Sequence, residues 1–225
     1  MRKLPHHIGI ILDGNRRWAK KRGLKISEGH KKGLERAIEI INYCNKRGIK
    51  ILTLFVFSTE NWKRSKREIN WLVKLGKKAF NNHFSHLLEE NIKIKIIGNK
   101  EKLPKSLQKE IEKIEKESEK NNGMLLNLAL SYGGRAEIVE AIKKIIKKKI
   151  PVEKITEETI KENLWTSDVD LIIRTGKEKR ISNFLLWQSA YSELYFCEKF
   201  WPDFTPKDLD LALIEYSKRK RKFGR

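Results

Sequence analysis

Short apolar runs that alternate with helix-length amphipathic segments constrain the fold of this chain more than any other feature. The clearest run spans residues 49–57, where only Lys50 and Thr53 interrupt the apolar residues. A strand has such a nearly continuous apolar run when helices cover both faces of its sheet. Further runs predict strands at 8–12, 92–97, 125–132, 169–173 and 194–196. We therefore expect an α/β fold: a single layered domain over residues 1–225, with a mostly parallel six-stranded sheet surrounded by helices.

Helical segments are predicted between these strands. Apolar residues recur at helical spacing in four segments, which begin near residues 34, 69, 104 and 134. Asn15 and Thr156 are expected to cap shorter helices, and Gly48 is expected to end the helix that begins near residue 34. A further helix is predicted over 182–192, and the last one over 206–222.

The chain carries a strong positive charge. Its 225 residues include 50 Lys and Arg against 29 Asp and Glu, which gives a formal net charge of +21. Such a surface favours anionic partners: nucleic acid, an anionic membrane or a phosphorylated small molecule. Charge by itself does not choose among these classes, because lysines on helix faces also serve only to keep a protein soluble.

Cysteine usage and hydropathy indicate a reduced, cytoplasmic protein. Cys44 and Cys197 lie far apart and neither belongs to a CxxC pair, so neither a zinc site nor a disulfide framework is expected. No apolar run approaches the roughly 20 residues needed to span a bilayer. The first residues, Met-Arg-Lys-Leu-Pro, lack the apolar core of a signal peptide.

Polar residues gather directly after the predicted strands, at 13–18, 58–64, 132–135 and 174–182. In open α/β sheets ligands collect at the carboxyl ends of strands, where free backbone N–H groups attract anions. In the first of these segments Asp13 is followed by Gly14, which permits a tight turn, and then by basic residues. A diphosphate suits this turn, with Asp13 placed to hold its metal ion.

Signatures of several large enzyme classes are absent. The chain has no GxxxxGK[ST] phosphate loop, no GxGxxG, HExxH or GxSxG motif, and no kinase motif set. It also lacks the DDxxD carboxylate cluster with which the all-α prenyl synthases bind magnesium diphosphate.

Seven motifs instead occur in order along the chain. They are Asp13-Gly-Asn-x-Arg-Trp18, Gly29-His30, Phe57-Ser-Thr-Glu-Asn-Trp62, Tyr132-Gly-Gly-Arg135, Asp170-Leu-Ile-Ile-Arg-Thr-Gly176, Arg180-Ile-Ser-Asn-Phe-Leu-Leu-Trp-Gln188 and Ser192-Glu-Leu-Tyr-Phe196. Together they resemble the motifs of the cis-prenyltransferases, most closely those of the undecaprenyl diphosphate synthase (UPP synthase) type. The resemblance runs from about His7 to the C-terminus, and the order of the motifs makes it specific although no single motif would.

This resemblance implies a polyprenyl diphosphate synthase, a transferase of prenyl groups. Isopentenyl diphosphate is expected to add repeatedly to an allylic primer, farnesyl (C15) or geranylgeranyl (C20) diphosphate. The product is expected to be a long-chain polyprenyl diphosphate with new cis double bonds, the precursor of a glycosyl carrier lipid. The parallel-sheet fold, the homodimer and the Mg²⁺ cofactor of the family are implied as well.

The resemblance also implies roles for individual residues. Asp13 and Glu193 are expected to hold Mg²⁺, and Asp13 or Asn61 is expected to assist proton removal. The allylic diphosphate is expected to bind Gly14, Asn15, Arg16, Arg17, Trp18 and His30. The incoming isopentenyl diphosphate is expected to bind Arg174, Arg180, Ile181 and Ser182. A mobile segment that closes over substrate is expected to include Ser58, Thr59, Glu60, Asn61, Trp62, Arg64 and Glu68.

Three positions depart from the family pattern. Ile26 stands where the family often has an arginine, and Lys25 is the expected substitute for that charge. Lys179 stands where many bacterial relatives have histidine, so charge is kept while titration near neutral pH is lost. Arg16 stands where a glycine is frequent and adds a cation to the expected phosphate site.

A growing polyprenyl chain needs an apolar channel. Six residues are candidates for its wall: Leu34, Ile38, Ile41, Leu72, Phe80 and Phe84. Plain core packing is the alternative explanation for them. The excess positive charge, including residues 218–222, is expected to favour peripheral contact with an anionic membrane while the product leaves.

Two other functions stay open at this point. A basic nucleic-acid-binding protein would also carry a net charge of +21, and it would bind with steep salt dependence. The aromatic residues here lie mainly in apolar runs, and the order of the motifs has no reason on that view, so no nucleic-acid partner is expected. A noncatalytic family subunit would be expected to lack Asp13 or the segment 174–182, and this chain keeps both.

Overall fold

The computed structural model of the chain describes residues 4–220, and of residues 81–83 it describes the backbone alone. Its strands and helices, including the short 3₁₀ helices labelled η, follow in the order β1 (His7–Ile11), α1 (Asn15–Lys21), α2 (Ile26–Lys46), β2 (Ile51–Ser58), η1 (Thr59–Lys63), α3 (Lys66–Glu89), β3 (Lys93–Ile97), η2 (Lys100–Lys102), α4 (Lys105–Glu117), β4 (Leu125–Tyr132), α5 (Gly134–Lys147), η3 (Val152–Lys154), α6 (Glu157–Asn163), β5 (Leu171–Arg174), β6 (Glu193–Phe196), η4 (Trp201–Asp203) and α7 (Pro206–Lys218). None of the helices within residues 4–220 has the length and apolar composition that a membrane crossing requires.

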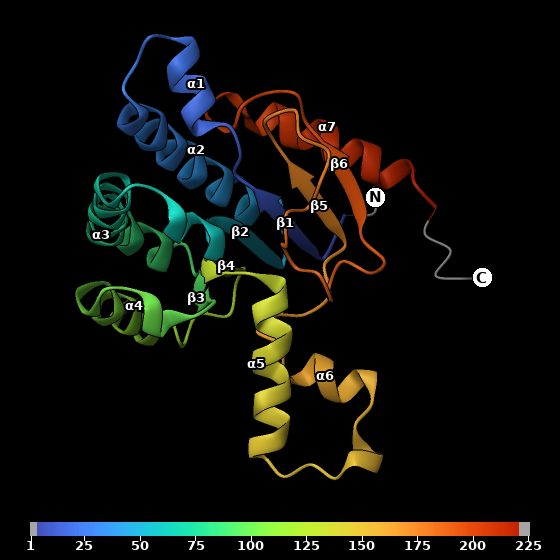
Figure 1. Ribbon diagram of the computed structural model, residues 1–225. Coiled ribbons are helices and arrows are strands. Elements are labelled where there is room, and N and C mark those ends of the chain that lie inside the picture. Colours follow the sequence, from blue (N-terminus) through green and yellow to red (C-terminus); the bar gives the residue numbers. More distant parts are fainter. Residues whose placement is uncertain (1–3, 221–225) are drawn as a thin grey trace.

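The six predicted strands form one sheet in the order β3-β4-β2-β1-β5-β6 (Figure 1). Every neighbouring pair is parallel, so the prediction of a mostly parallel six-stranded sheet is confirmed, and the sheet is parallel throughout. Because all strands run the same way, the segments that follow them leave the sheet at one edge.

The two faces of the sheet are covered differently. The larger core joins one face to the apolar sides of α2, α3, α4 and α7. The smaller core on the other face includes Tyr132, Phe184 and Leu185. Gly9 of β1 makes room there, because a Cβ at this position would lie 2.9 Å from the Phe184 ring. The second face is thus covered largely by the chain that leads from β5 to β6, not by a full layer of helices.

The helix predicted over 182–192 is wrong, because this segment is a series of turns. Ser182, Asn183 and Leu185 have φ angles of 48°, 64° and 45°, in the left-handed region that a right-handed helix cannot contain. The turns bring Phe184 and Leu185 onto the sheet, where both are fully buried. Burial of these two side chains therefore overrides the helical pattern of the local sequence.

Of three predicted helix ends, the structure confirms one and differs at the other two. Asn15 is the first residue of α1 and does not cap it, because Gly14 takes the cap position with φ 113° while the Asn15 amide donates to Leu12 O at 3.3 Å. Gly48 follows the end of α2 as predicted, with φ 79°. The last helix, α7, ends at Lys218 instead of 222: residues 219 and 220 are not helical, and residues 221 and 222 lie outside the described residues.

Polar residues inside the sheet are hydrogen bonded to one another, although Asn127 Oδ1 has no partner among the described residues. Nε2 of His7 lies 2.7 Å from Thr53 Oγ1, which also accepts a hydrogen bond from Asn127 Nδ2 at 3.0 Å. Nδ1 of His7 lies 2.9 Å from the Asp168 carbonyl oxygen. Burial lowers the pKa of His7 to about 4, so the ring is neutral near pH 7 and its role is structural.

Candidate functional site

The polar segments after β1, β2, β4 and β5 converge at the carboxyl edge of the sheet, as their positions in the sequence predicted. Arg174 is the last residue of β5 and pairs in register with Ile11, the last residue of β1. This pairing brings Arg174 next to Asp13, although 161 positions separate the two in the sequence.

Asp13 lies between two guanidinium groups. Its Oδ2 is 2.9 Å from Nη2 of Arg174 and 3.0 Å from Nη2 of Arg17. Its backbone carbonyl accepts hydrogen bonds from Trp201 N at 3.0 Å and from Thr175 Oγ1 at 2.8 Å. The main chain is therefore held from two sides, and the carboxylate is fixed between two positive charges at the sheet edge.

A pocket of about 530 Å³, here called the basic pocket, opens beside Asp13. It is lined by Leu12, Asp13, Gly14, Asn15, Arg16, Arg17, Lys20, Leu24, Ile26, His30 and Arg64. Only glycine fits at position 14, because φ is 113° and a Cβ would lie 2.7 Å from the Phe200 ring. With four Lys and Arg side chains in its lining, the pocket favours an anion with several oxygens, such as a diphosphate.

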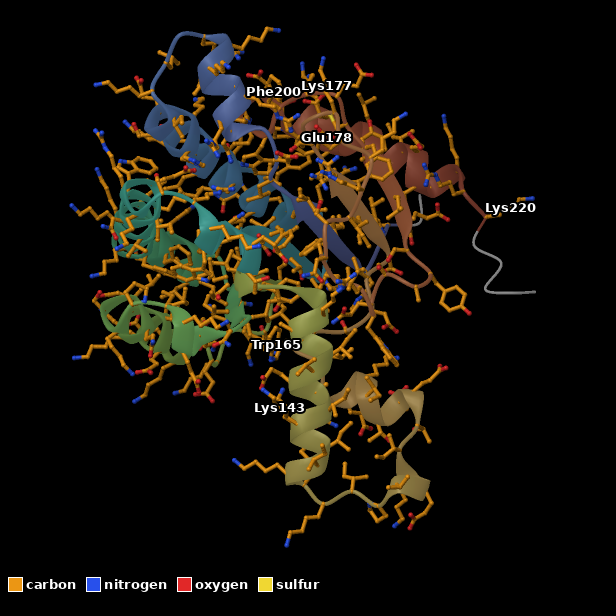
Figure 2. The ribbon with its side chains drawn as sticks, viewed as in Figure 1. Lys143, Trp165, Lys177, Glu178, Phe200 and Lys220 are labelled. Carbon is orange, nitrogen blue, oxygen red and sulfur yellow. The ribbon has the colours of Figure 1, made fainter. Side chains whose placement is uncertain are left out.

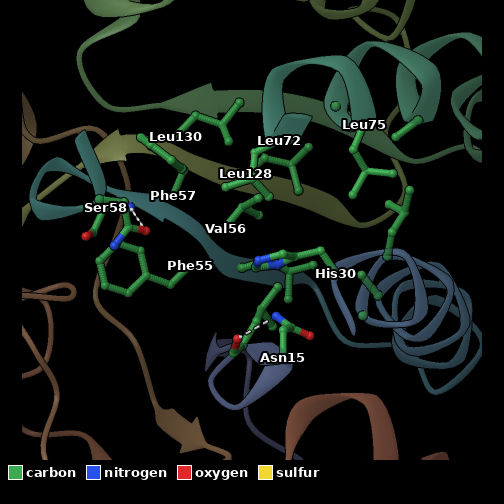
Figure 3. Close-up of a pocket in the computed structure, with 18 of the residues that line it drawn as sticks. Asn15, His30, Phe55, Val56, Phe57, Ser58, Leu72, Leu75, Leu128 and Leu130 are labelled. Carbon is green, nitrogen blue, oxygen red and sulfur yellow. Dashed lines mark hydrogen bonds between the residues drawn. The ribbon is translucent and has the colours of Figure 1, made fainter. Parts of the chain in front are cut away.

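A second space of about 720 Å³, here called the apolar cavity, adjoins the basic pocket. Figure 3 shows Leu72 and Leu75 of α3 around it, together with Val56 of β2 and Leu128 of β4. The two spaces share the lining residues Leu12, Asp13, Asn15, His30 and Arg64. A ligand with an anionic head and an apolar tail would fill both spaces.

All six channel candidates line the apolar cavity: Leu34, Ile38, Ile41, Leu72, Phe80 and Phe84. Leu34, Ile38 and Leu72 are half-buried at the cavity, and Leu34 also packs against the main core. Phe80 and Phe84 are buried and pack against the main core at the same time. The wall of the cavity is thus also part of the core.

Three buried polar atoms at these two spaces have no hydrogen-bond partner: Asn15 Oδ1, His30 Nε2 and Arg174 Nε. Buried polar atoms in folded proteins are nearly always bonded, so Asn15 Oδ1 and Arg174 Nε are available to a ligand, whereas His30 Nε2 has Glu68 Oε1 at 3.5 Å. Burial, together with the nearby charge of Arg64, lowers the pKa of His30 despite the opposing effect of Glu68. The ring is therefore neutral near pH 7.

Residues 58–64 form a compact turn over the apolar cavity. Asn61 Oδ1 accepts a hydrogen bond from Ser58 N at 3.2 Å, and Trp62 Nε1 donates to Ser131 Oγ at 2.9 Å. Arg64 Nη1 donates to Glu68 Oε1 at 3.1 Å. These bonds orient the segment so that Ser58, Asn61 and Arg64 face the cavity.

The structure brings most of the predicted site residues together. The apolar cavity is lined by Asp13, Asn15, His30, Ser58, Glu60, Asn61, Trp62, Arg64, Arg174 and Ser182, and the basic pocket adds Gly14, Arg16 and Arg17. Six predicted residues line neither space: Trp18, Thr59, Glu68, Arg180, Ile181 and Glu193.

Trp18 and Glu68 line neither space but contact residues near them. The Trp18 indole N–H donates to Asp203 Oδ1 at 2.7 Å, and its ring packs under the Arg22 guanidinium. Glu68 Oε1 lies 3.5 Å from His30 Nε2 and 3.1 Å from Arg64 Nη1. Trp18 is therefore a packing residue in this structure, whereas Glu68 positions two side chains of the pocket.

Arg180 and Ile181 contribute mainly through their backbone and packing. The Arg180 side chain is 60% exposed and pairs with Glu178 Oε2 at 2.6 Å, while its carbonyl oxygen accepts a hydrogen bond from Arg174 Nη1. Ile181 packs against the smaller core. Glu178, which no sequence motif singled out, also contacts Arg17 Nη1 at 3.0 Å, and Figure 2 shows it with Phe200 beside α1.

The structure bears on the charge that is missing at position 26. Ile26 lines the basic pocket, and so does Lys20, whereas Lys25 is not among the lining residues. Lys25 instead precedes α2, where its backbone N–H donates to Glu28 Oε2 at 2.8 Å. Lys20, one turn along α1 from Arg16, is therefore better placed than Lys25 to supply the charge.

Glu193 lies at the amino end of its strand, whereas Asp13 follows the carboxyl end of β1. Glu193 opens β6 and pairs with Leu171, which pairs with Ile8 near the start of β1. Five residues further along, Asp13 is displaced by about 15 Å along the strands. Glu193 accepts a hydrogen bond from Arg219 Nη1 at 2.7 Å. Within one chain these two carboxylates cannot share a metal ion.

Asp13 is suited to bind a metal ion that is already coordinated by a substrate diphosphate. Within residues 4–220, no cluster of three His, Cys, Asp or Glu side chains could hold a metal ion by itself. Mg²⁺ is usually held by one or two carboxylates together with phosphate oxygens of the substrate. One carboxylate at the junction of the two spaces therefore suffices if a diphosphate supplies further ligands.

Comparisons with known proteins agree with this geometry. Residues 11–224 match a family model described as "Putative undecaprenyl diphosphate synthase". An isoprenyl transferase of Fusobacterium nucleatum is 47% identical over 225 residues, covering 99% of this chain and 97% of that protein. An isoprenyl transferase of Thermotoga maritima is 47% identical over 227 residues, with the same two coverages.

Two solved structures share the fold over nearly the whole chain. Lavandulyl diphosphate synthase from Lavandula x intermedia, in complex with dimethylallyl diphosphate, has a TM-score of 0.95 and 38% identity, with 99% of each chain covered. A "probable undecaprenyl diphosphate synthase" from Campylobacter jejuni has a TM-score of 0.86 and 34% identity, with both chains fully covered.

Proposed function

This chain belongs to the undecaprenyl diphosphate synthase family of prenyltransferases, and on that premise we propose that it catalyses cis-prenyl chain elongation. Isopentenyl diphosphate adds in successive steps to an allylic primer, farnesyl or geranylgeranyl diphosphate. The product is a long-chain polyprenyl diphosphate, the precursor of a glycosyl carrier lipid. Family membership does not favour the alternative of a nucleic-acid-binding protein.

One observation carries this proposal: the basic pocket and the apolar cavity meet at Asp13, Asn15 and His30. An allylic diphosphate places its diphosphate in the basic pocket and its hydrocarbon tail in the cavity. Isopentenyl diphosphate then binds on the other side of Asp13, near Arg174 and Ser182. The two reacting carbons would meet at the mouth of the cavity, so that the product grows into apolar surroundings.

The side chains of the site suit the electronic demands of this reaction. The allylic carbon–oxygen bond breaks, and its electron pair leaves with the diphosphate. The double bond of isopentenyl diphosphate attacks the allylic carbon, and loss of a proton forms the new double bond. Arg16, Arg17 and Arg64 stabilise the charge that develops on the leaving group. Asp13 is the candidate base, whereas the Asn61 amide, which does not accept a proton near neutral pH, positions substrate.

Mg²⁺ would neutralise part of the diphosphate charge when bound. Asp13 would hold it together with phosphate oxygens of the substrate. Glu193 can contribute to the same ion only from a second copy of the chain, because of its distance from Asp13 within one copy.

Incubation with Mg²⁺, labelled isopentenyl diphosphate and a panel of allylic primers tests the function. Chromatography of the dephosphorylated products is expected to show a ladder of chains that differ by one isoprene unit, and EDTA is expected to abolish it. Absence of elongation from every primer would overturn the proposal. The same chromatogram identifies the preferred primer and the product length.

We also propose a homodimer. Helix α5 projects from the sheet together with α6 (Figure 1) and exposes Val139, Ile142 and Ile146 on one side. β6 is an edge strand of the sheet; Arg219 Nη1 bonds its Leu194 carbonyl oxygen at 3.1 Å, and a second chain can cover the rest of this edge. Light scattering is expected to give the mass of two chains, and Ile142→Glu with Ile146→Glu is expected to give one. A wild-type monomer would contradict the homodimer.

Peripheral contact with an anionic membrane is proposed for the outer face of α3. Lys66, Arg67, Lys74 and Lys78 are exposed there, and the nearest acidic residue, Glu68, is turned towards His30 and Arg64. Lys74→Glu with Lys78→Glu is expected to weaken sedimentation with vesicles that contain phosphatidylglycerol by at least about tenfold. Equal sedimentation of wild type and variant would exclude this surface.

Gly76→Leu is expected to shorten the product. Gly76 lines the apolar cavity, and a Cβ placed there meets no heavy atom within 4 Å, so a larger side chain fills space that the growing chain would otherwise take. Leucine also forms helix better than glycine, so α3 should persist. Lys78→Leu, on the exposed side of α3, is the control and should leave product length unchanged. An unaltered length in Gly76→Leu would contradict a channel wall at this position.

A further inference from the structure

Asn183 occupies an unusual position in the chain that follows β5. It lines the apolar cavity and has a φ of 64°, next to Ser182 with a φ of 48°. Asparagine and aspartate tolerate this left-handed conformation better than other residues with a side chain. The backbone at residues 182–183 is therefore in the left-handed conformation, and surrounding contacts must hold it there.

Asn183 is hydrogen bonded to two other segments of the site. Its carbonyl oxygen accepts from Gly134 N at 2.7 Å, and its Oδ1 accepts from Arg135 N at 2.9 Å, so it is fixed to the start of α5. Its Nδ2 donates to Glu60 Oε1 at 3.1 Å, in the segment that follows β2. Close approach depends on Gly133, where a Cβ would lie 2.7 Å from Asn183 Nδ2.

Both ends of this connection lead to residues of the site. On one side, Ser182 Oγ accepts a hydrogen bond from Arg174 Nη1 at 2.6 Å, and Arg174 contacts Asp13. On the other side, Glu60 belongs to η1, which also carries Asn61 and Trp62. Polar contacts therefore link Asp13 to Arg174, Arg174 to Ser182, and Asn183 to η1, while the backbone joins Ser182 to its neighbour Asn183.

Glu60 is ionised at neutral pH, which strengthens the bond from Asn183. Partial burial would raise the pKa of Glu60, but hydrogen bonds from its own backbone N–H and from Ser58, Asn183 and Thr59 outweigh burial and lower the pKa. Hydrogen bonds to a charged acceptor are stronger than those between neutral groups. The Asn183–Glu60 contact joins the segment after β5 to η1 through their side chains.

We propose that Asn183 is a positioning residue that couples the segment around Ser182 to η1, so that the two halves of the site are set together. The proposal rests on the proposed function, because it assigns Ser182 to the isopentenyl diphosphate and η1 to the closure over substrate. Asn183 is not a catalytic residue in this scheme. It fixes the distance between two loops that hold different parts of the substrates.

A double-mutant cycle between Asn183 and Glu60 tests the coupling. Asn183→Asp keeps the acceptor for Arg135 N and the left-handed backbone, but it places a carboxylate opposite Glu60. In the chain that keeps Glu60, Asn183→Asp is expected to lower kcat/KM for isopentenyl diphosphate by about tenfold. In the Glu60→Gln background the new amide donates to the introduced carboxylate, and the same substitution is expected to cost less than about threefold.

Asn91→Asp is the matched control, because Asn91 also has a positive φ, 57°, and lies at the far end of α3 outside the site. It should leave kcat and KM unchanged. If Asn183 only anchored α5, Asn183→Asp would not lower kcat/KM, because the acceptor for Arg135 N remains. No loss in Asn183→Asp, or an equal loss in both Glu60 backgrounds, would overturn the proposal.

Backbone hydrogen exchange of residues 59–63 in the ligand-free protein provides a readout that needs no turnover. Asn183→Asp is expected to speed this exchange at least about threefold, and Glu60→Gln in the same chain is expected to reverse the effect. If the wild type failed to elongate any primer, the proposed function would fall, while exchange would still decide whether the two loops are coupled. Unchanged exchange in Asn183→Asp would overturn the coupling by itself.

Discussion

Asp13→Ala is expected to lower kcat by at least about 10³-fold while the fold persists. The carboxylate of Asp13 lies at the junction of the basic pocket and the apolar cavity, between Arg17 and Arg174. Its loss removes the metal ligand proposed above and leaves two guanidinium groups without their shared partner. Steady-state kinetics with saturating Mg²⁺ and both substrates measure the effect.

The loss of stability in Asp13→Ala should be small by comparison. The side chains of Asp13 and Arg17 are 29% and 40% exposed, so water screens their pair, while buried Arg174 keeps its bonds to Ser182 Oγ and the Arg180 carbonyl oxygen. We expect a cost of about 1–2 kcal/mol. Asp203→Asn is the matched control, because Asp203 also contacts an arginine, Arg22, but lines neither space. The control should keep kcat within about threefold. A near-normal rate in Asp13→Ala would remove the central assignment of the site.

Arg174→Ala is expected to lower kcat/KM for isopentenyl diphosphate by about 10²-fold or more. The guanidinium of Arg174 is 5% exposed and contacts Asp13, Ser182 Oγ and the Arg180 carbonyl oxygen. Its removal takes a buried cation from the proposed isopentenyl diphosphate site and releases Ser182, and each charged hydrogen bond lost costs about 1.5–3 kcal/mol. Initial rates at varied isopentenyl diphosphate and saturating primer measure the change.

Arg22→Ala is the control for Arg174→Ala, because Arg22 packs on Trp18 outside both spaces. Arg180→Ala should raise KM for isopentenyl diphosphate by a smaller factor than Arg174→Ala, because the Arg180 side chain is 60% exposed. If Arg174→Ala instead changed only the KM for the allylic primer, the assignments of the two diphosphate sites would be reversed.

The sheet could be predicted from the sequence because each strand is a local apolar run. Ile8, Ile10 and Ile11 of β1 are all buried, as are Ile172 and Ile173 of β5, so composition alone indicated strands covered on both faces. The same pattern failed over 182–192. Phe184 and Leu185 are adjacent in the sequence, and both pack on the sheet beside Gly9, a contact that joins distant parts of the chain.

The candidate site could be predicted only in part. Polar segments after parallel strands meet at one edge, so Asp13, Arg174 and residues 58–64 were expected together. Which side chain of a segment faces the ligand depends on turns and partners that the sequence does not reveal. For that reason Trp18 and Arg180 were expected to touch substrate but line neither space, while Asn183 was overlooked.

By itself, the sequence determined the six strands, their parallel arrangement, and the clustering of cationic residues behind a single aspartate, because these follow from local composition and from strand direction. The tertiary structure alone decided that half-buried Leu34, Ile38 and Leu72 border an open space, and that Glu193 lies far from Asp13. The physical reason is that a cavity and a distance depend on how separate elements pack, whereas apolar periodicity is the same whether a side chain meets a neighbour or an empty volume.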